Sequence, residues 1–136
     1  MSNTRFATAI HIMTLLAKDP QEWLTSDWLA GSININSVII RKEIGVLKEA
    51  GLILSRQGKI GGSKIAKKAD EISISEIYSA VKNSDVLGKK NVNPNPACPV
   101  GKEINNRLND LFTETDQLVI RFLSGKSLQE FMEQFE

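Results

Sequence analysis

The 136-residue sequence is poor in the residue types that build most metal sites and disulfides. It has one cysteine, Cys98, and one histidine, His11. A single cysteine excludes a disulfide within the chain and a zinc or iron–sulfur site made from several thiolates of one chain. His11 falls inside a predicted helix without a second histidine or a carboxylate cluster near it, so we assign it no chemistry. We therefore expect no cofactor and no bound metal.

Long apolar runs are also missing. No stretch of about 18 apolar residues is present, which argues against a transmembrane helix. The N-terminus lacks the charged start, apolar centre and small-residue cleavage site of a secretory signal. The expectation is a cytoplasmic protein that does not bind a membrane. The chain also offers no nucleophile–base pair, metal-ligand spacing or phosphate-binding glycine loop beside a buried strand, so we do not expect an enzyme.

What the sequence does contain is the pattern of a short capped helix, which is predicted to run from about Ser26 to Ile33. Thr25 and Ser26 are both residue types that cap helix N-termini, and the apolar residues after them recur at helical spacing. Asn34 and Asn36 then indicate a break, because asparagine caps helices and tolerates unusual backbone angles. A second helix is therefore expected to begin at about residue 37.

The second predicted helix covers Ser37–Ala50 and ends before Gly51. Ile40, Ile44 and Leu47 recur at spacings of four and three residues, which places them on one buried stripe. The residues that lie mainly off this stripe near the N-terminal end are Ser37, Val38, Arg41 and Lys42. In a helix-turn-helix protein, this end of the second helix reaches base edges in the major groove of DNA.

A hairpin is expected directly after this helix. Residues 52–56 and 63–67 are short strand-like runs, and glycines in residues 57–62 supply the positive φ that a hairpin turn needs. We interpret the hairpin as the wing of a winged helix-turn-helix domain. The predicted fold is thus mainly α, with a small β-hairpin wing.

Positive charge is concentrated on this motif. Residues 36–68 contain eight basic and two acidic residues, a local charge of plus six, although the whole chain carries only plus one. Clustered cations are what phosphate contacts and counterion release require, so we predict double-stranded DNA as the partner. Two alternatives stay open. The basic residues could simply form a solvated surface, or the winged helix could serve contacts with another protein, because a fold does not fix a function.

Helices are predicted on both sides of the winged helix. Residues 4–17 form an amphipathic core helix, and Ser73 caps a short helix that continues to Val81. Residues 82–97 lose periodicity and are predicted to form a loop. A long helix from Val100 to about Leu123 follows this loop.

The long helix carries a stripe of apolar residues spaced by four, three, seven and four positions. A stripe of this length has too little partner surface within a small chain, so we predict a homodimer formed through paired long helices. The alternative is that the stripe docks on the first helix, and an amphipathic segment at 127–135 would cover either partner. The stripe residues are Ile104, Leu108, Leu111, Leu118 and Phe122.

Cys98 stands at the start of the long helix. Pro99 suits the first helical position, which puts Cys98 at or next to the N-cap. There the helix dipole and free backbone amides favour the thiolate, and an exposed thiolate is open to oxidants. Two hypotheses follow: Cys98 is a redox sensor, or it is inert packing like most free cysteines.

Four segments taken in order resemble the Rrf2 family of bacterial winged-helix regulators, and the resemblance covers nearly the whole chain. They are SVIIRK (37–42), LKEAGLI (47–53), Gly61-Gly62 and NPACPVG (95–101). The resemblance implies a dimeric transcriptional repressor whose long C-terminal helix crosses its mate. The sequence resembles the short members of the family more closely than it resembles the members that bind an iron–sulfur cluster. Those members hold an iron–sulfur cluster with three cysteines in the loop before the long helix, where this chain has only Cys98.

The resemblance also bears on Cys98 and on the wing. Other relatives respond to oxidants through a cysteine at the start of the long helix, and some use a partner thiol near the first helices that this chain lacks. A disulfide of Cys98 would then join it to the dimer mate or to a small thiol. The chain departs from the family at Gln57, where many relatives have the wing arginine, and at Ser63, which replaces a common aromatic. Arg56 is a candidate substitute for the wing arginine.

We thus predict a winged helix-turn-helix DNA-binding domain over residues 1–83, a linker loop with Cys98 over 84–99 and dimerisation helices over 100–136. The predicted function is that of a homodimeric repressor whose operator affinity is controlled by oxidation of Cys98. A repressor that responds to a small molecule, with a structural Cys98, and a winged-helix protein-interaction module are the alternatives. Arg41 is the candidate for a guanine contact. The predicted DNA-binding residues are Ser26, Asn36, Ser37, Val38, Arg41, Lys42, Arg56, Lys59 and Lys64.

Overall fold

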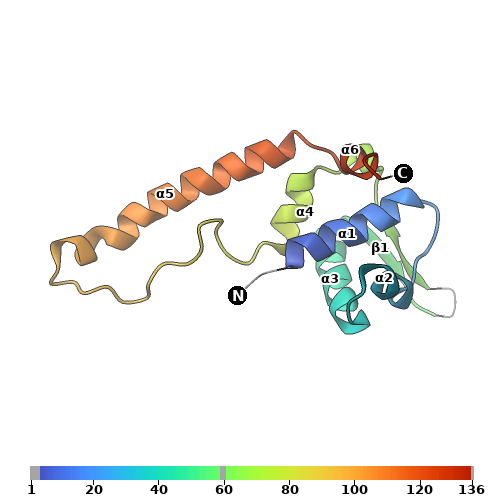
Figure 1. The fold of residues 1–136 in the computed structure, drawn as a ribbon, viewed down its shortest axis with the longest axis horizontal. Coiled ribbons are helices and arrows are strands. Elements are labelled where there is room, and N and C mark those ends of the chain that lie inside the picture. The colour runs from blue at the N-terminus through green and yellow to red at the C-terminus, as the bar shows by residue number, and fades with distance from the viewer. Residues whose placement is uncertain (1–3, 59–60, 136) are drawn as a thin grey trace. The chain divides into compact units, whose positions relative to one another are not determined.

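The structure is a computed structural model that describes residues 4–58 and 61–135. The described residues are mainly helical and contain one antiparallel sheet of two strands (Figure 1). The predicted winged helix-turn-helix fold with a long C-terminal helix is confirmed. The elements are α1 (Arg5–Lys18), α2 (Ser26–Ile33), α3 (Ser37–Glu49), β1 (Ile53–Arg56), β2 (Gly62–Ile65), the 3₁₀ helix η1 (Ala69–Glu71), α4 (Ile74–Val81), α5 (Pro99–Ser124) and α6 (Leu128–Met132).

Side-chain caps build the turn between α2 and α3. The Thr25 hydroxyl accepts a hydrogen bond from the Trp28 amide at 3.1 Å and so caps α2. Asn34 ends α2 in the left-handed region, at a φ of 64°. The Asn36 side chain caps α3 by accepting from the Val38 amide at 2.8 Å. These contacts satisfy backbone groups that helix ends leave without partners, so the two asparagines fix the turn.

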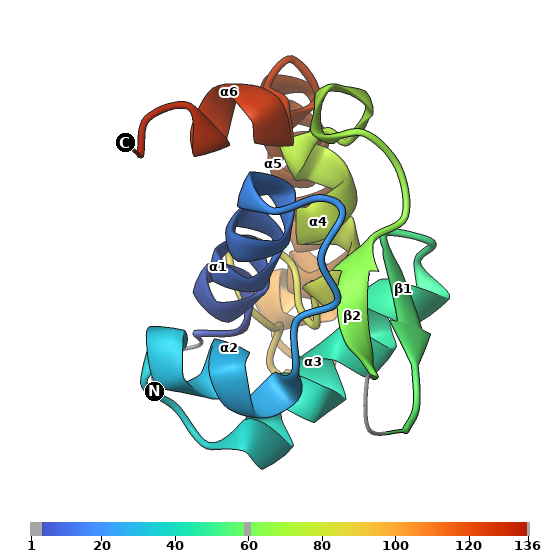
Figure 2. The ribbon, with the colours of Figure 1, turned by 90° about the vertical axis from the view of Figure 1, so that its right-hand side faces the viewer.

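The chain divides into two compact units, which are described separately. The first contains the residues up to Lys82 and those from Leu123 onward, and the second contains residues 83–122. In the first unit, α1 is surrounded by α2, α3, α4 and α6, and α3 also packs against β1 (Figure 2). The apolar side chains between these elements are buried away from water, and this burial is the main force that holds the elements together. The large side chains that are fully buried are Ile12, Met13, Leu16, Leu29, Ile40, Leu47, Leu52, Ile53, Ile72, Ile77 and Leu128.

The wing hairpin is joined to the segment that precedes α2. Two backbone hydrogen bonds, of 2.8 and 2.9 Å, connect Leu24 with Ser63 of β2. Next to this bridge, Gly62 has a φ of 144°, and a Cβ atom there would lie 2.7 Å from the Leu24 carbonyl oxygen. Glycine at position 62 is therefore required for the close approach of the two segments.

The C-terminal segment returns to the first unit. The Leu128 amide donates to the Ile72 carbonyl at 2.8 Å, and the Ile74 amide donates to the Lys126 carbonyl at 2.9 Å. Because Leu128 is fully buried and α6 packs on α1 and η1, the residues after the long helix belong with the winged helix. The unit boundary thus falls near the end of α5, whereas the predicted division placed all residues from 100 onward together. α6 is also shorter than the predicted amphipathic segment 127–135.

In the second unit, the loop of residues 83–98 runs along one side of α5. The Val86 amide donates to the Asp116 carboxylate at 2.9 Å, and the Asn105 side chain donates to the Asn91 carbonyl at 2.9 Å. Phe112, which lies between these two positions on the helix, is buried. The loop therefore covers the side of α5 that carries residues 105, 112 and 116.

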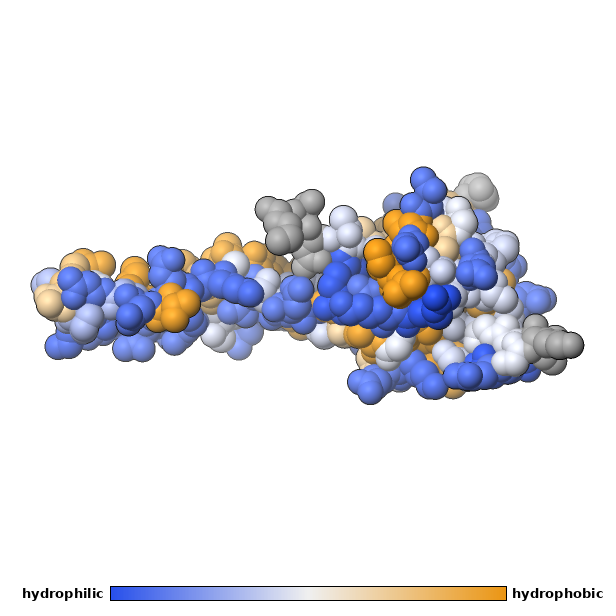
Figure 3. Space-filling model, turned by 90° about the horizontal axis from the view of Figure 1, so that it is seen from below, coloured by the Kyte–Doolittle hydropathy of each residue, from blue (hydrophilic) through white to orange (hydrophobic). Residues whose placement is uncertain are grey.

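The predicted apolar stripe lies on another side of α5. Leu111, Leu118 and Phe122 are 52%, 59% and 65% exposed, while Ile104 and Leu108 are half-buried. Apolar surface recurs between hydrophilic side chains along this unit (Figure 3). Across the described residues, no helix combines the length and apolar character needed to cross a membrane.

Candidate nucleic-acid interface

A groove of about 500 Å³ separates α3 from the wing hairpin. Its walls come from the outward side of α3, the facing residues of the hairpin and the start of α2. The described lining residues include three cations and no carboxylate. They are Thr25, Ser26, Arg41, Ile44, Gly45, Lys48, Ser55, Arg56, Gln57, Gly58, Gly61, Gly62 and Ser63.

The charges of this groove suit a polyanion. Arg41 and Lys48 come from α3, and Arg56 comes from β1. Ser26 is the first residue of α2, whose N-terminal amides and dipole favour an anion such as a phosphate. The elements thus bring cations from two segments and a helix N-terminus to one concave surface.

Arg41 is the best placed of the predicted base-reading residues. It is exposed on α3, and its Nη1 atom donates to the Ser37 hydroxyl at 3.4 Å, one helical turn earlier. One turn further along lies Gly45, which is exposed and has open space where a side chain would be. A ligand can therefore approach the backbone of α3 closely beside the Arg41 side chain.

Ser26 and Arg56 also line the groove, whereas Asn36, Ser37, Val38, Lys42 and Lys64 are not among its described lining residues. Val38 is 61% exposed and Lys42 is also exposed, both near the N-terminal end of α3. The carboxamide oxygen of Asn36 is engaged as the cap of α3. Lys64 lies on β2, and Lys59 is outside the described residues.

Two residues that the sequence did not single out lie in or beside this groove. Lys48 lines the groove one turn beyond Ile44, and the basic character of its segment was the available signal. Trp23 lies with its ring centroid 4.3 Å from Arg56 Cζ and 4.9 Å from Lys64 Nζ. Nothing in the local sequence around Trp23 indicates these contacts, because both cations come from the hairpin.

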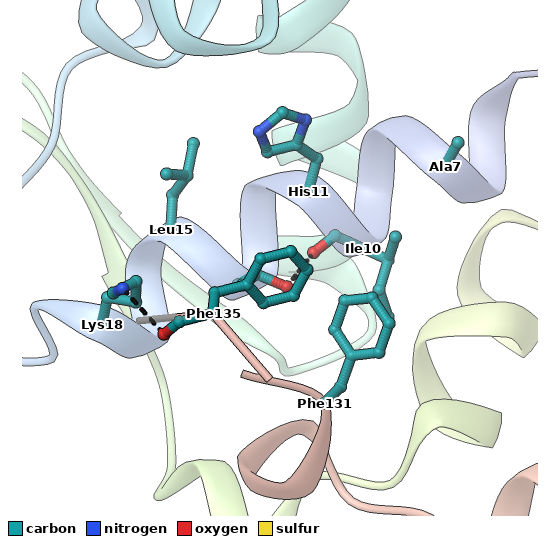
Figure 4. Close-up of a pocket in the computed structure, with 8 residues that line it drawn as sticks. Ala7, Ile10, His11, Leu15, Lys18, Phe131 and Phe135 are labelled. Atoms are coloured by element: carbon teal, nitrogen blue, oxygen red, sulfur yellow. Dashed lines mark hydrogen bonds between the residues drawn. The ribbon is translucent and has the colours of Figure 1, made fainter. Parts of the chain in front are cut away.

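A second cavity, of about 330 Å³, lies between α1 and α6 (Figure 4). Ile10 and Leu15 of α1 and the rings of Phe131 and Phe135 give it apolar walls, and Lys18 donates to the Phe135 carbonyl at 3.2 Å. Its volume is within the range of small-molecule sites. The remaining lining residues are Ala7, His11 and Thr14.

Cys98 occupies the N-cap position of α5, directly before Pro99. Its side chain is exposed, and hydrogen bonds from the backbone amides of Gly101 and Val100 lower the pKa of the thiol. The preceding loop is held in place by Asn95, whose side chain accepts from the Ala97 amide at 3.0 Å. The position therefore favours a solvent-accessible thiolate.

Comparisons with known proteins agree with this geometry. The profile of the Rrf2 family, described as an iron-dependent transcriptional regulator, matches residues 2–134. The chain is 39% identical over 132 residues to YwnA of Bacillus subtilis (strain 168), a candidate HTH-type transcriptional regulator, and the match covers 97% of both proteins. It is 35% identical to a candidate DNA-binding protein of known crystal structure, with a TM-score of 0.74 over 94% of this chain and 98% of that one. CymR, the global cysteine regulator of B. subtilis, shares the fold, with 20% identity and a TM-score of 0.68 over 100% of this chain and 98% of that one.

Proposed function

The chain belongs to the Rrf2 family of transcriptional regulators, which are not enzymes, and from this premise we propose that it is a homodimeric repressor that binds double-stranded DNA. The observation that carries the proposal is the groove between α3 and the wing, lined by Arg41, Lys48 and Arg56 without a carboxylate among its described residues. Such a regulator acts in the cytoplasm of a bacterium, where the DNA lies.

In the proposed complex, the N-terminal half of α3 enters the major groove. Arg41 makes a bidentate contact with guanine, and Ser37 helps to orient the guanidinium through the hydrogen bond described above. Lys42 and Val38, exposed near the same end, contact the neighbouring backbone and bases. The wing cations, which are Arg56, Lys64 and the predicted Lys59, bind phosphate or the minor groove.

The proposed dimer forms through α5. The exposed Leu111, Leu118 and Phe122 support it, because a row of large apolar side chains in water is unfavourable and is commonly covered by a partner. Two-fold symmetry then presents two copies of α3 to half-sites about one DNA turn apart.

The family is described as iron-dependent, and its resemblance to this chain raises the iron–sulfur cluster of its cluster-binding members, but the residues of this chain do not fit such a cluster. A cluster held by one chain needs about four ligands, mostly thiolates. Cys98 is the only cysteine of the sequence. Among the described residues, no three histidine, cysteine, aspartate or glutamate side chains form a group that could hold a metal ion. We derive no role for iron.

Oxidation of Cys98 is the proposed control of DNA affinity. The Cys98 thiolate attacks one oxygen of hydrogen peroxide and the O–O bond breaks, so that the sulfur becomes a sulfenic acid and the other oxygen leaves as hydroxide. A second thiol, from Cys98 of the mate or from a small thiol, then condenses with the sulfenic acid to a disulfide and releases water. The change at the start of α5 alters how the two long helices meet, and so the separation of the two α3 helices.

Fluorescence anisotropy of the purified protein on duplexes from the DNA upstream of its own gene tests this proposal. Salt-sensitive binding that survives random-sequence competitor is expected, together with loss of affinity after peroxide treatment. The Cys98→Ser variant should bind equally well and ignore peroxide. If this variant keeps the full response, oxidation acts elsewhere; if no duplex is bound specifically, a protein-docking role for the winged helix is favoured instead.

A second candidate function is repression controlled by a small molecule, which the cavity between α1 and α6 favours. Its apolar walls, with Lys18 and His11 among the lining residues, suit a small apolar carboxylic acid. Thermal-shift screening of such acids, followed by anisotropy with the hits, tests this role. A compound that releases DNA should fail on an Ala7→Trp variant that fills the cavity and should still act on Cys98→Ser.

A further inference from the structure

We propose that Trp23 is a positioning residue of the DNA interface, which holds Arg56 and Lys64 as an ordered pair of cations on the wing. The proposal rests on the DNA-binding function proposed above and adds a residue that neither the family motifs nor the groove includes. Its evidence is the packing of one aromatic ring against two cations that come from different strands.

The geometry is that of two cation–π contacts on one ring. The Trp23 centroid lies 4.3 Å from Arg56 Cζ and 4.9 Å from Lys64 Nζ. Both distances are inside the roughly 6 Å at which an aromatic ring attracts a cation, and tryptophan has the strongest attraction of the three aromatic side chains. Trp23 is half-buried, so its ring is partly shielded from water.

The register of the hairpin explains why the two cations meet the same ring. Arg56 pairs with Gly62, and Leu54 pairs with Lys64. Since alternate residues of a strand share a face, Arg56, Leu54 and Lys64 project from one face, with the two cations at diagonal positions. Two like charges at this spacing repel each other unless a group between them offsets the repulsion.

The segment before α2 brings the ring to this face. The amide and the carbonyl of Leu24 are both hydrogen-bonded to the backbone of Ser63. The preceding residue, Trp23, is therefore held beside β2. Gly62, opposite Arg56, has no side chain, and any Cβ atom there would collide with Leu24. Glycine at position 62 therefore leaves room for the segment that carries Trp23 to lie against β2.

The consequence for DNA binding is preorganisation. Arginine and lysine side chains lose much conformational freedom when they bind a phosphate, and affinity falls by the cost of ordering them. An aromatic ring that already restrains both cations reduces this cost. Trp23 thus acts through Arg56 and Lys64 and does not itself need to touch DNA.

A double-mutant cycle tests the proposal, with a duplex enriched from a random-sequence pool by the wild-type protein as the probe. Trp23→Leu should weaken binding about ten-fold, whereas Trp23→Phe, which keeps a ring, should stay within about three-fold of wild type. In an Arg56→Ala/Lys64→Ala background, Trp23→Leu should change the affinity less than about two-fold, because the cations it positions are gone. Thermal unfolding of each variant is measured in parallel.

The outcomes separate this proposal from the one on which it rests. If the wild-type protein enriches and binds no duplex, the DNA-binding function itself fails. If the wild type binds and Trp23→Leu binds equally well, only the role of Trp23 is overturned. An equal loss from Trp23→Leu in the wild-type and the Arg56→Ala/Lys64→Ala backgrounds also overturns it, since Trp23 would then act independently of the two cations. If Trp23→Leu does not fold, Trp23→Phe becomes the test. An affinity of Trp23→Phe as low as that of the Arg56→Ala/Lys64→Ala protein would contradict the proposal.

Discussion

Arg5 of α1 and Glu43 of α3 form a doubly hydrogen-bonded ion pair that joins the first helix to the helix proposed to read DNA. The Arg5 Nε and Nη2 atoms donate to the two carboxylate oxygens of Glu43, each at 2.9 Å. The Glu43 side chain is only 3% exposed. Hydrogen bonding to Glu43 raises the pKa of Arg5 above its ordinary value, so the guanidinium stays charged. The pair therefore fixes one side of α3 while its opposite side faces the groove.

Replacing Arg5 with alanine should lower the free energy of unfolding by about 3 kcal/mol, because the Glu43 carboxylate is then buried without its charged partner. Urea denaturation followed by circular dichroism measures the loss. An Arg5→Met/Glu43→Leu double variant should recover most of it, since an apolar pair can replace a buried ion pair. A loss below about 0.5 kcal/mol in the single variant would show that the pair does not stabilise α3.

Replacing Arg41 with alanine should weaken binding to the preferred duplex by about 1 to 3 kcal/mol and relax base preference at one position of each half-site. Lys42→Ala is the matched control on the same helix and should weaken binding about equally on all sequences. Anisotropy on the preferred duplex and on single-base variants distinguishes the two. An equal loss for Arg41→Ala on every sequence would make Arg41 a phosphate contact.

Replacing Leu118 with glutamate should convert the proposed dimer to a monomer, because a charge is placed on the exposed stripe of α5. Sedimentation velocity gives the mass of each species. Val92→Glu is the matched control, since Val92 is 98% exposed on the loop outside the stripe. A Leu118→Glu protein that still sediments as a dimer would move the interface away from this part of α5.

The Cys98 thiol should titrate below the range of an ordinary cysteine. Hydrogen bonds from the Gly101 and Val100 amides stabilise the thiolate and lower its pKa, so the reactive fraction near neutral pH rises. The alkylation rate with iodoacetamide, measured against pH, should therefore have a lower midpoint in the folded protein than in urea.

Gly101→Ala is the corresponding structural variant for Cys98. A Cβ atom at position 101 would lie 2.5 Å from the Asn95 carbonyl oxygen, so the loop must shift. The amide hydrogen bonds to the Cys98 thiolate should then weaken. The midpoint of alkylation should then move up towards that of the unfolded chain. Identical midpoints for the folded and the urea-unfolded wild-type protein would contradict the proposed stabilisation of the thiolate.

The sequence was most informative where a structure depends on neighbouring residues. The caps at Thr25, Asn36 and Ser73 and the left-handed Asn34 were indicated by residue type and by the helical pattern that follows. The bounds of α2 agree with the prediction, and those of α3 agree to within one residue. The placement of Cys98 before α5 followed from Pro99 in the same way. These features rest on local hydrogen bonds and fixed backbone angles, which a short stretch of chain specifies.

Contacts between distant segments were not available from the sequence. The register of the hairpin and the Leu24–Ser63 bridge decide that Trp23 meets Arg56 and Lys64. Likewise, the Arg5–Glu43 pair joins residues 38 positions apart.

The sequence by itself therefore determined the order of the elements, the winged helix-turn-helix and the position of the single cysteine. Only the tertiary structure decided that the residues after α5 return to the first unit, that an open cavity lies between α1 and α6, and which cations share the ring of Trp23. The physical reason is that periodicity shows which side of an element is apolar. Which other element covers that side depends on how the whole core packs.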